Sequence, residues 1–226
     1  MKKRTKLADR TMPNYTRGEE VFNMVSHIVG AALGIVALVL CIVFAVKNGH
    51  GPLAVVSVII YGMALIILYT MSSVYHGLRL NMGKRVMRVI DHCTIYFLIA
   101  GTYTPILLIA MLPKFPVETW IIFGIEWGCA AIAATLTAID LKKYDKLSLA
   151  CYIIMGWIII FFINKTYEAV GTGGIVFLLL GGVAYTVGSI LYVIGRKKKW
   201  MHSVFHLFIL AGSILQFFAI IFFVLN

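Results

Sequence analysis

The stretch MHSVFHLFILAGSILQFFAIIFFVLN, residues 201–226, decides the fold class of this chain. After its first six residues it is almost wholly apolar, and as one helix it can cross a hydrocarbon core of about 30 Å. Two histidines, His202 and His206, stand in its first turns, directly after a basic run and a tryptophan. Imidazoles at the start of a membrane helix need polar partners, because lipid offers none.

The composition of the whole chain agrees with this segment. The chain has 226 residues, of which 61% are hydrophobic and only 13% are charged. A soluble domain carries about 25% charged residues, so we predict an integral membrane protein. The net charge of +11 is therefore interpreted by its position along the chain, and we expect no nucleic-acid partner.

Further apolar stretches of similar length precede residue 201. The predicted fold class is all-α integral membrane, a bundle of seven transmembrane helices, with residues 21–226 as the membrane domain and 1–20 as a basic tail. Glycines within it are expected to permit close helix packing. The spans are expected at about 21–46, 53–78, 88–111, 119–140, 147–164, 173–195 and 201–225.

Basic residues gather on one side of this predicted bundle. The first twenty residues and alternate loops hold all but three of the 20 Lys and Arg residues, the exceptions being Lys47, Lys114 and Lys165. The positive-inside rule then places residues 1–20 in the cytoplasm and Asn226 outside. We expect a multi-pass protein of a bacterial plasma membrane, in contact with membrane lipids.

Four clusters of polar residues are predicted to lie at one depth near the cytoplasmic face. Alternating spans bring together the starts of the first, third and seventh spans and the end of the second. Residues four apart share one face of a helix, as in the pairs Ser72–His76 and His202–His206. The clusters are EEVFNMVSHIVG (19–30), SSVYH (72–76), DHC (91–93) and HSVFH (202–206).

A metal explains this conjunction most economically. Zinc suits imidazole ligands, and three histidines (His76, His202 and His206) with an open fourth position are typical of a catalytic site. Asp91 could then contact a water on the zinc, and Ser72 could hydrogen-bond nearby. Bis-histidine haem needs ligands on opposite sides, whereas the two histidines of the last span share one face. A single HxxxH pair would more often be a packing or interfacial pair, so the prediction depends on the clusters together.

Three motifs resemble those of one family. The first span has the spacing Glu20–Asn23–His27–Gly30, SSVYH closes the second and is followed by an aspartate, and HSVFH opens the last. Together they resemble the hemolysin III group, within the progestin and adipoQ receptor family of seven-span proteins. The resemblance covers essentially the whole chain.

This resemblance implies an N-in bundle of seven helices with a zinc ion near the cytoplasmic face. It implies that His76, His202 and His206 hold the zinc, and that Ser72 and Asp91 correspond to the nearby serine and aspartate of the family. Glu20, Asn23 and His27 are then expected to surround the ligands and orient them.

Two functions remain open at this stage. Animal receptors of the family are linked to hydrolysis of lipid amides, which favours a zinc hydrolase acting on a membrane-lipid amide or ester. Bacterial members carry a label of hemolytic activity, which leaves a sensor or a pore with structural zinc as the alternative. Outside the clusters, we expect His92 to be interfacial, and Glu126 and Gln216 to be hydrogen-bonded inside the bundle.

Overall fold

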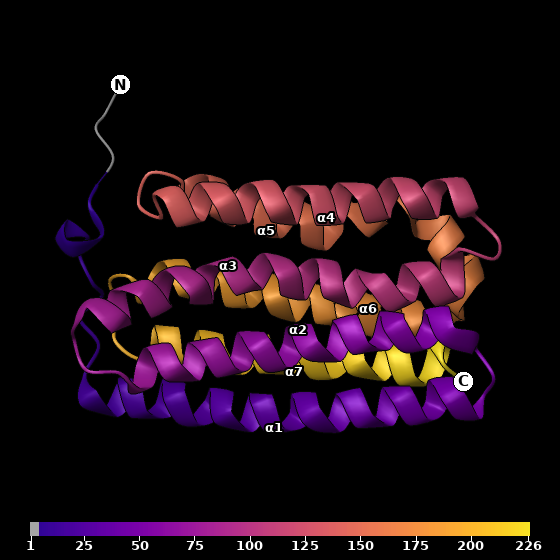
Figure 1. Ribbon diagram of the computed structural model, residues 1–226, viewed down its shortest axis with the longest axis horizontal. Coiled ribbons are helices and arrows are strands. Elements are labelled where there is room, and N and C mark those ends of the chain that lie inside the picture. Colours follow the sequence, from indigo (N-terminus) through magenta and orange to yellow (C-terminus); the bar gives the residue numbers. More distant parts are fainter. Residues whose placement is uncertain (1–4) are drawn as a thin grey trace.

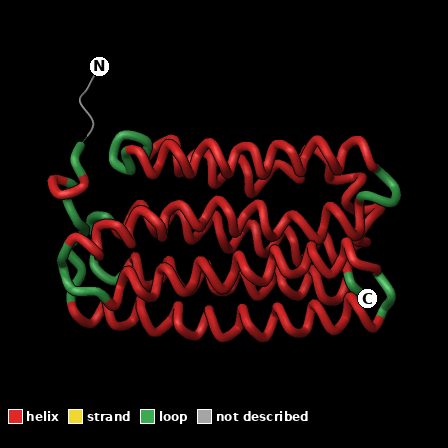
Figure 2. Tube along the Cα trace, in the orientation of Figure 1, coloured by secondary structure: helices red, strands yellow, loops and turns green. Residues whose placement is uncertain are grey.

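Residues 5–226 are described by the computed structural model, and they form a bundle of helices that run along a common direction (Figure 1). Within this part of the chain Figure 2 shows helices and loops and no strand. Three basic residues of the predicted tail lie outside the described part of the chain, namely Lys2, Lys3 and Arg4. The helices are α1 (Arg17–Lys47), α2 (Gly51–Gly77), α3 (Met82–Pro105), α4 (Pro116–Ile139), α5 (Asp145–Trp157), α6 (Ile163–Gly195) and α7 (Met201–Ala219).

Shorter helical turns adjoin these helices. A 3-10 turn precedes α1 and another joins α5 to α6, while π-helical turns extend α3 and α7. With them α3 reaches Met111 and α7 reaches Val224, so both have the length that a membrane span requires. These turns are Leu7–Asp9, Ile158–Phe162, Ile106–Met111 and Ile220–Val224.

Helix caps move several boundaries away from the predicted ones. α1 begins at Arg17 rather than 21, because the Thr16 hydroxyl accepts from the Glu19 amide at 3.3 Å and the Glu19 carboxylate accepts from the Thr16 amide at 2.8 Å. α3 likewise begins before its apolar part, after the Asn81 cap. Caps satisfy the free amides of the first turn with polar groups. Hydropathy alone therefore places these helix starts too late, and the segment before α1 ends at residue 16.

Six helical stretches in the described chain are long and apolar enough to cross a membrane. The fifth, Asp145–Gly195, has 51 residues and would be about 77 Å long as a straight helix. At its two ends, however, the Arg196 guanidinium pairs with the Asp145 carboxylate at 2.7 Å. The chain must therefore reverse its direction between them. Part-way along, Trp157 Nε1 donates to Thr186 Oγ1 at 2.9 Å. α5 and α6 are therefore two legs that lie side by side over part of their length.

The turn between these legs differs from the predicted one. α6 begins at Ile163, ten residues before the predicted start at 173, and it contains a break at Gly171, where φ is 67°. This left-handed value is readily adopted only by glycine. The break lies within the gap predicted between the spans 147–164 and 173–195, so the apolar pattern located it but did not predict the helical residues that precede it.

Close packing between the helices depends on small residues. A Cβ atom on Gly62 of α2 would lie 2.6 Å from the Leu38 Cβ of α1. One on Gly101 of α3 would lie 2.8 Å from the Ala64 Cβ of α2. Such contacts allow backbones to approach closely where no hydrophobic effect draws helices together, as in lipid. Large apolar side chains face outward: Val36 and Val43 are each 50% exposed, and Ile132 is 65% exposed.

Candidate metal centre

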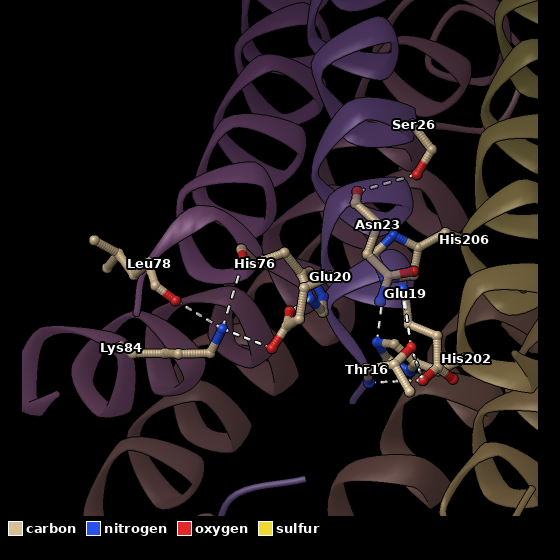
Figure 3. A network of polar contacts seen from close by, with 10 residues as sticks. All are labelled: Thr16, Glu19, Glu20, Asn23, Ser26, His76, Leu78, Lys84, His202 and His206. Atoms are coloured by element: carbon tan, nitrogen blue, oxygen red, sulfur yellow. Dashed lines mark hydrogen bonds and ion pairs between the residues drawn. The ribbon is translucent and has the colours of Figure 1, made fainter. Parts of the chain in front are cut away.

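Three histidine side chains converge at one end of the bundle. His76 comes from the last turn of α2, and His202 and His206 come from the first turns of α7. All three are buried, and each offers a ring nitrogen within 4.8 Å of those of the other two. The Nε2 atoms of His202 and His206 lie 3.2 Å apart (Figure 3). Two nitrogens bound to one tetrahedral zinc are about 3.3–3.4 Å apart, so this pair fits zinc.

The hydrogen bond of His76 also fits a metal. Its Nδ1 atom lies 2.6 Å from Glu20 Oε2, and because a carboxylate can only accept, Nδ1 must carry the proton. The lone pair is therefore on Nε2, which is buried and has no partner among the described residues. A carboxylate behind the ligand histidine is the usual arrangement at zinc sites, where it sets the tautomer and the ring orientation. The donor set thus suits zinc.

A buried lysine holds the Glu20 carboxylate in place. Lys84 Nζ lies 2.7 Å from Glu20 Oε1 and donates to the carbonyl oxygen of Leu78 at 2.9 Å (Figure 3). Only 7% of the Lys84 side chain is exposed, compared with 20% for Glu20. Sequence reasoning counted Lys84 among the loop charges that set topology and missed this contact. No local sequence signal indicated it, because the two residues are 64 positions apart and meet only through helix packing.

The start of α7 is tied to the start of α1. Trp200, which precedes α7, has a left-handed backbone with φ of 65°, a conformation uncommon outside glycine. Its amide donates to Glu19 Oε1 at 2.6 Å, while the other oxygen of that carboxylate caps α1 through Thr16. Glu19 therefore joins the two helix starts and fixes where the histidines of α7 enter the bundle. Sequence reasoning did not single out Glu19.

Asn23 and His27 of α1 lie beside the ligand group and are almost fully buried. The His27 ring stacks on His206 with centroids 3.8 Å apart and meets Tyr69 edge-on at 4.9 Å. Neither ring nitrogen of His27 and neither amide atom of Asn23 has a side-chain partner among the described residues. Of the three residues expected to orient the ligands, Glu20 contacts one through a hydrogen bond and His27 contacts one by stacking.

Ser72 and Asp91 line the same cavity as His202 and His206. Ser72 is buried, one turn before His76 on α2, and 16% of the Asp91 side chain is exposed. The Asp91 carboxylate is not part of the group of three ligand nitrogens. It therefore stands at the cavity wall, where it can act on a molecule near the metal site rather than complete the ligand set.

His92 lines the cavity, and only 14% of its side chain is exposed. Its Nδ1 atom donates to the carbonyl oxygen of Arg88 at 2.8 Å. Its Nε2 atom then accepts from the Tyr192 hydroxyl of α6 at 3.3 Å. The interfacial role expected for His92 concerns its depth in the membrane and stays a prediction.

The cavity extends from the histidines toward the middle of the bundle. Its volume is about 160 Å³, and most of its wall is apolar. Asp91 at one end and Ile106 farther along α3 both line it, which at the rise of a helix places them roughly 22 Å apart. Its lining comes mainly from α3, α5, α6 and α7, with one residue of α1 and two of α2.

Two other polar residues lie away from the histidines. Glu126 of α4 is fully buried, and neither carboxylate oxygen has a hydrogen-bond partner among the described residues. Gln216 lines the cavity on α7, and its Nε2 atom donates to the carbonyl oxygen of Leu178 at 3.1 Å. The expectation of internal hydrogen bonding was therefore right for one end of Gln216 and wrong for Glu126.

Fold and site together define an all-α integral membrane protein with a buried group of histidines at one end of its bundle. The family model described as Haemolysin-III related matches residues 15–217. Because the match covers nearly all of the chain, the chain belongs to this family. The resemblance inferred from the three motifs is confirmed.

Relatives of this chain include two bacterial proteins. It is 38% identical over 207 residues to "Hemolysin-3" of Bacillus cereus, with 92% of each chain covered. It is 35% identical over 209 residues to "Hemolysin-3 homolog" of Bacillus subtilis strain 168, covering 92% of this chain and 96% of the relative. A human relative, "Monocyte to macrophage differentiation factor", is 28% identical over 172 residues, covering 71% and 67% of the two chains.

Proposed function

We propose that this protein is an intramembrane zinc hydrolase that cleaves an amide or ester bond of a membrane lipid. The observation that carries the proposal is the convergence of His76, His202 and His206 at the end of an apolar cavity. These three residues would hold the metal and leave a position open toward the cavity. Bound zinc would supply a Lewis acid and a water whose pKa is lowered toward 7.

The side chains around the metal site have separate tasks in this proposal. The Asp91 carboxylate accepts a proton at one of its oxygens as water attacks the lipid carbonyl, and passes it to the leaving group. The Ser72 hydroxyl hydrogen-bonds beside Asp91 and orients the reacting groups. Glu20 holds the proton on Nδ1 of His76 and so keeps the ligand in one tautomer.

The cavity supports a lipid substrate. One leaflet is about half of the ~30 Å hydrocarbon core, so a cavity of roughly 22 Å can hold an extended acyl chain. Its apolar wall excludes water from the chain, while the polar groups at its end meet the linkage to the head group. The scissile bond would then lie at the boundary between the apolar and polar parts.

The same proposal includes seven membrane spans with the amino terminus in the cytoplasm and Asn226 outside. The reversal between α5 and α6 supports two spans in the stretch Asp145–Gly195. The distribution of Lys and Arg residues supports the orientation. The site then lies near the cytoplasmic face of a bacterial plasma membrane.

A sensor or pore in which zinc is structural is the second candidate. The names of the bacterial relatives favour a hemolytic role for those proteins, and a metal bound by His76 and His202 would join α2 to α7. Against a pore, the titratable residues of the cavity lining that belong to the four clusters gather at one end, and most of the wall beyond them is apolar. The hydrolase is therefore the proposal that we develop.

The deciding experiment changes Asp91→Asn. Asparagine keeps the shape but cannot accept a proton, and general-base catalysis contributes about 10²–10⁴-fold. We expect the variant to retain zinc by mass spectrometry and to lose fatty-acid release from a lipid panel in nanodiscs by that factor. Asp9→Asn, at an exposed carboxylate, is the matched control. A zinc-loaded wild-type protein that releases no fatty acid from any lipid would favour the sensor.

A further inference from the structure

The segment that precedes α1 lies across the end of the bundle that carries the histidines. We call residues 5–16 the N-terminal strap. At its beginning the Thr5 amide donates to Asp140 Oδ2 at 3.0 Å, and the Arg10 guanidinium donates to the carbonyl oxygen of Ile139 at 2.9 Å. Both acceptors lie at the end of α4. The strap therefore reaches from the start of α1 to the far side of the bundle.

Two arginines of α3 hold the middle of the strap. The Arg88 guanidinium donates to the carbonyl oxygen of Thr11 at 2.8 Å, and that of Arg85 donates to the carbonyl oxygen of Arg10. Both guanidinium groups bind backbone carbonyls, and that of Arg88 also contacts Met12 Sδ at 3.9 Å, so they fix the path of the strap. Sequence reasoning assigned both arginines to topology alone.

The strap ends by placing an aromatic ring on the histidines. The Tyr15 ring stacks on His202 with centroids 4.7 Å apart and planes 18° from parallel. Its centroid is 5.8 Å from that of His76.

We propose that Tyr15 is a positioning residue of the candidate metal centre: it closes the centre on the side of the strap and stabilises metal-bound His202. The proposal builds on the zinc site proposed above. An imidazole bound to zinc takes up part of the metal's charge, and the face of a tyrosine ring attracts a cation within about 6 Å. The ring also covers two of the proposed ligands on the side of the strap, so water and chelators reach them from that side only when the strap moves.

The contacts that hold the strap in place lead to a second expectation, which would not arise if Tyr15 made only a local aromatic contact. Arg10 is buried at the end of α4 and contacts backbone atoms of residues 5 and 139 rather than any histidine. If the strap positions Tyr15, loss of the Arg10 guanidinium should open the metal site as well. If Tyr15 simply packs where it lies, Arg10→Ala should leave the site unchanged.

The first test follows zinc transfer from purified, zinc-loaded protein in detergent to a coloured chelator. We expect Tyr15→Ala to release zinc about tenfold faster, since a stacked aromatic pair with cationic character contributes that much. Tyr15→Phe should stay close to wild type, because it keeps the ring, and Arg10→Ala should fall between them. Tyr167→Ala, at an exposed tyrosine of α6, is the matched control. Equal release rates for Tyr15→Ala and wild type would overturn the proposal.

The second test uses metal-free protein and so separates this proposal from the presence of zinc. Diethyl pyrocarbonate acylates accessible imidazoles, and mass spectrometry reports modification of His202 and His206. We expect faster acylation of His202 in Tyr15→Ala and Arg10→Ala than in wild type or Tyr15→Phe. Unchanged acylation would refute closure by the strap. If wild type takes up no zinc but the variants acylate faster, the zinc proposal fails while closure stands.

Discussion

Glu20→Gln tests the proposed ligand geometry most directly, because it changes one atom behind the candidate metal ligand His76. The carboxylate accepts from His76 Nδ1 at 2.6 Å and from Lys84 Nζ at 2.7 Å. A glutamine has one accepting oxygen and one donating nitrogen, so it can satisfy only one of these two donors. If its nitrogen faces His76, the ring must accept at Nδ1 and carry its proton on Nε2, the atom that binds the metal.

The expected size of this effect follows from the position of Glu20. Its side chain is 20% exposed and contacts the proposed ligand His76. Glu20 is not itself one of the three proposed ligands. Loss of such a partner typically costs 10–100-fold in metal affinity, which corresponds to about 1.4–2.8 kcal/mol. Lys84→Met should weaken zinc binding less, since Glu20 can still accept from His76. In the double variant, the loss of zinc-binding free energy should be smaller than the sum of the two single losses, because residues of one hydrogen-bond network are not additive.

The assay is a competition for zinc between purified protein and a fluorescent chelator at fixed pH. Glu118→Gln is the matched control, because Glu118 also pairs with a lysine, Lys165, but belongs to the first turn of α4. We expect that control to bind zinc like wild type. If Glu20→Gln binds zinc as tightly as the control, Glu20 does not set the tautomer of His76 and the reasoning fails.

Three further predictions concern the metal, the packing and the topology. His76→Ala should abolish stoichiometric zinc and lower the melting temperature, because the proposed metal would join α2 to α7; unchanged zinc content by mass spectrometry would contradict the proposed ligand set. Gly30→Ala should cost about 1–3 kcal/mol of stability, since its Cβ would lie 2.6 Å from Tyr69 Cδ1, whereas Gly124→Ala, in open space, should leave the melting temperature unchanged or raise it. A reporter fused after Asn226 should be active outside the cytoplasm, and activity only inside would reverse the orientation.

Much of the fold follows from local properties of the sequence. Apolar length identifies membrane helices because an unpaired backbone is costly in lipid, and this suffices to locate α1, α2, α4 and α7 to within a few residues. The same property separates the fifth predicted span from the sixth, because Asn164, Lys165 and Glu168 interrupt the apolar pattern between them. It does not give the geometry of the reversal, in which the chain turns through the apolar 3-10 segment Ile158–Phe162 and breaks again at Gly171.

The three histidines could be predicted from the sequence because their placement depends only on helical spacing and on the alternation of spans. His202 and His206 share a face by helical period, and alternation of the spans brings the end of α2, with His76, to the same depth. What surrounds them could not be found this way. Lys84 meets Glu20 across 64 positions, and Trp200 meets Glu19 across 181.

The sequence alone thus determined the class of protein and the residues most suited to bind a metal, since both depend on apolar length and on spacing within single helices. Only the tertiary structure decided that Lys84 holds the carboxylate behind His76 and that Tyr15 covers His202. It also decided that the Glu126 carboxylate is buried with no hydrogen-bond partner among the residues that the structure describes. These relations depend on how far one helix rotates and slides against another. That choice is made by close packing of side chains over the whole bundle, and no short stretch of sequence encodes it.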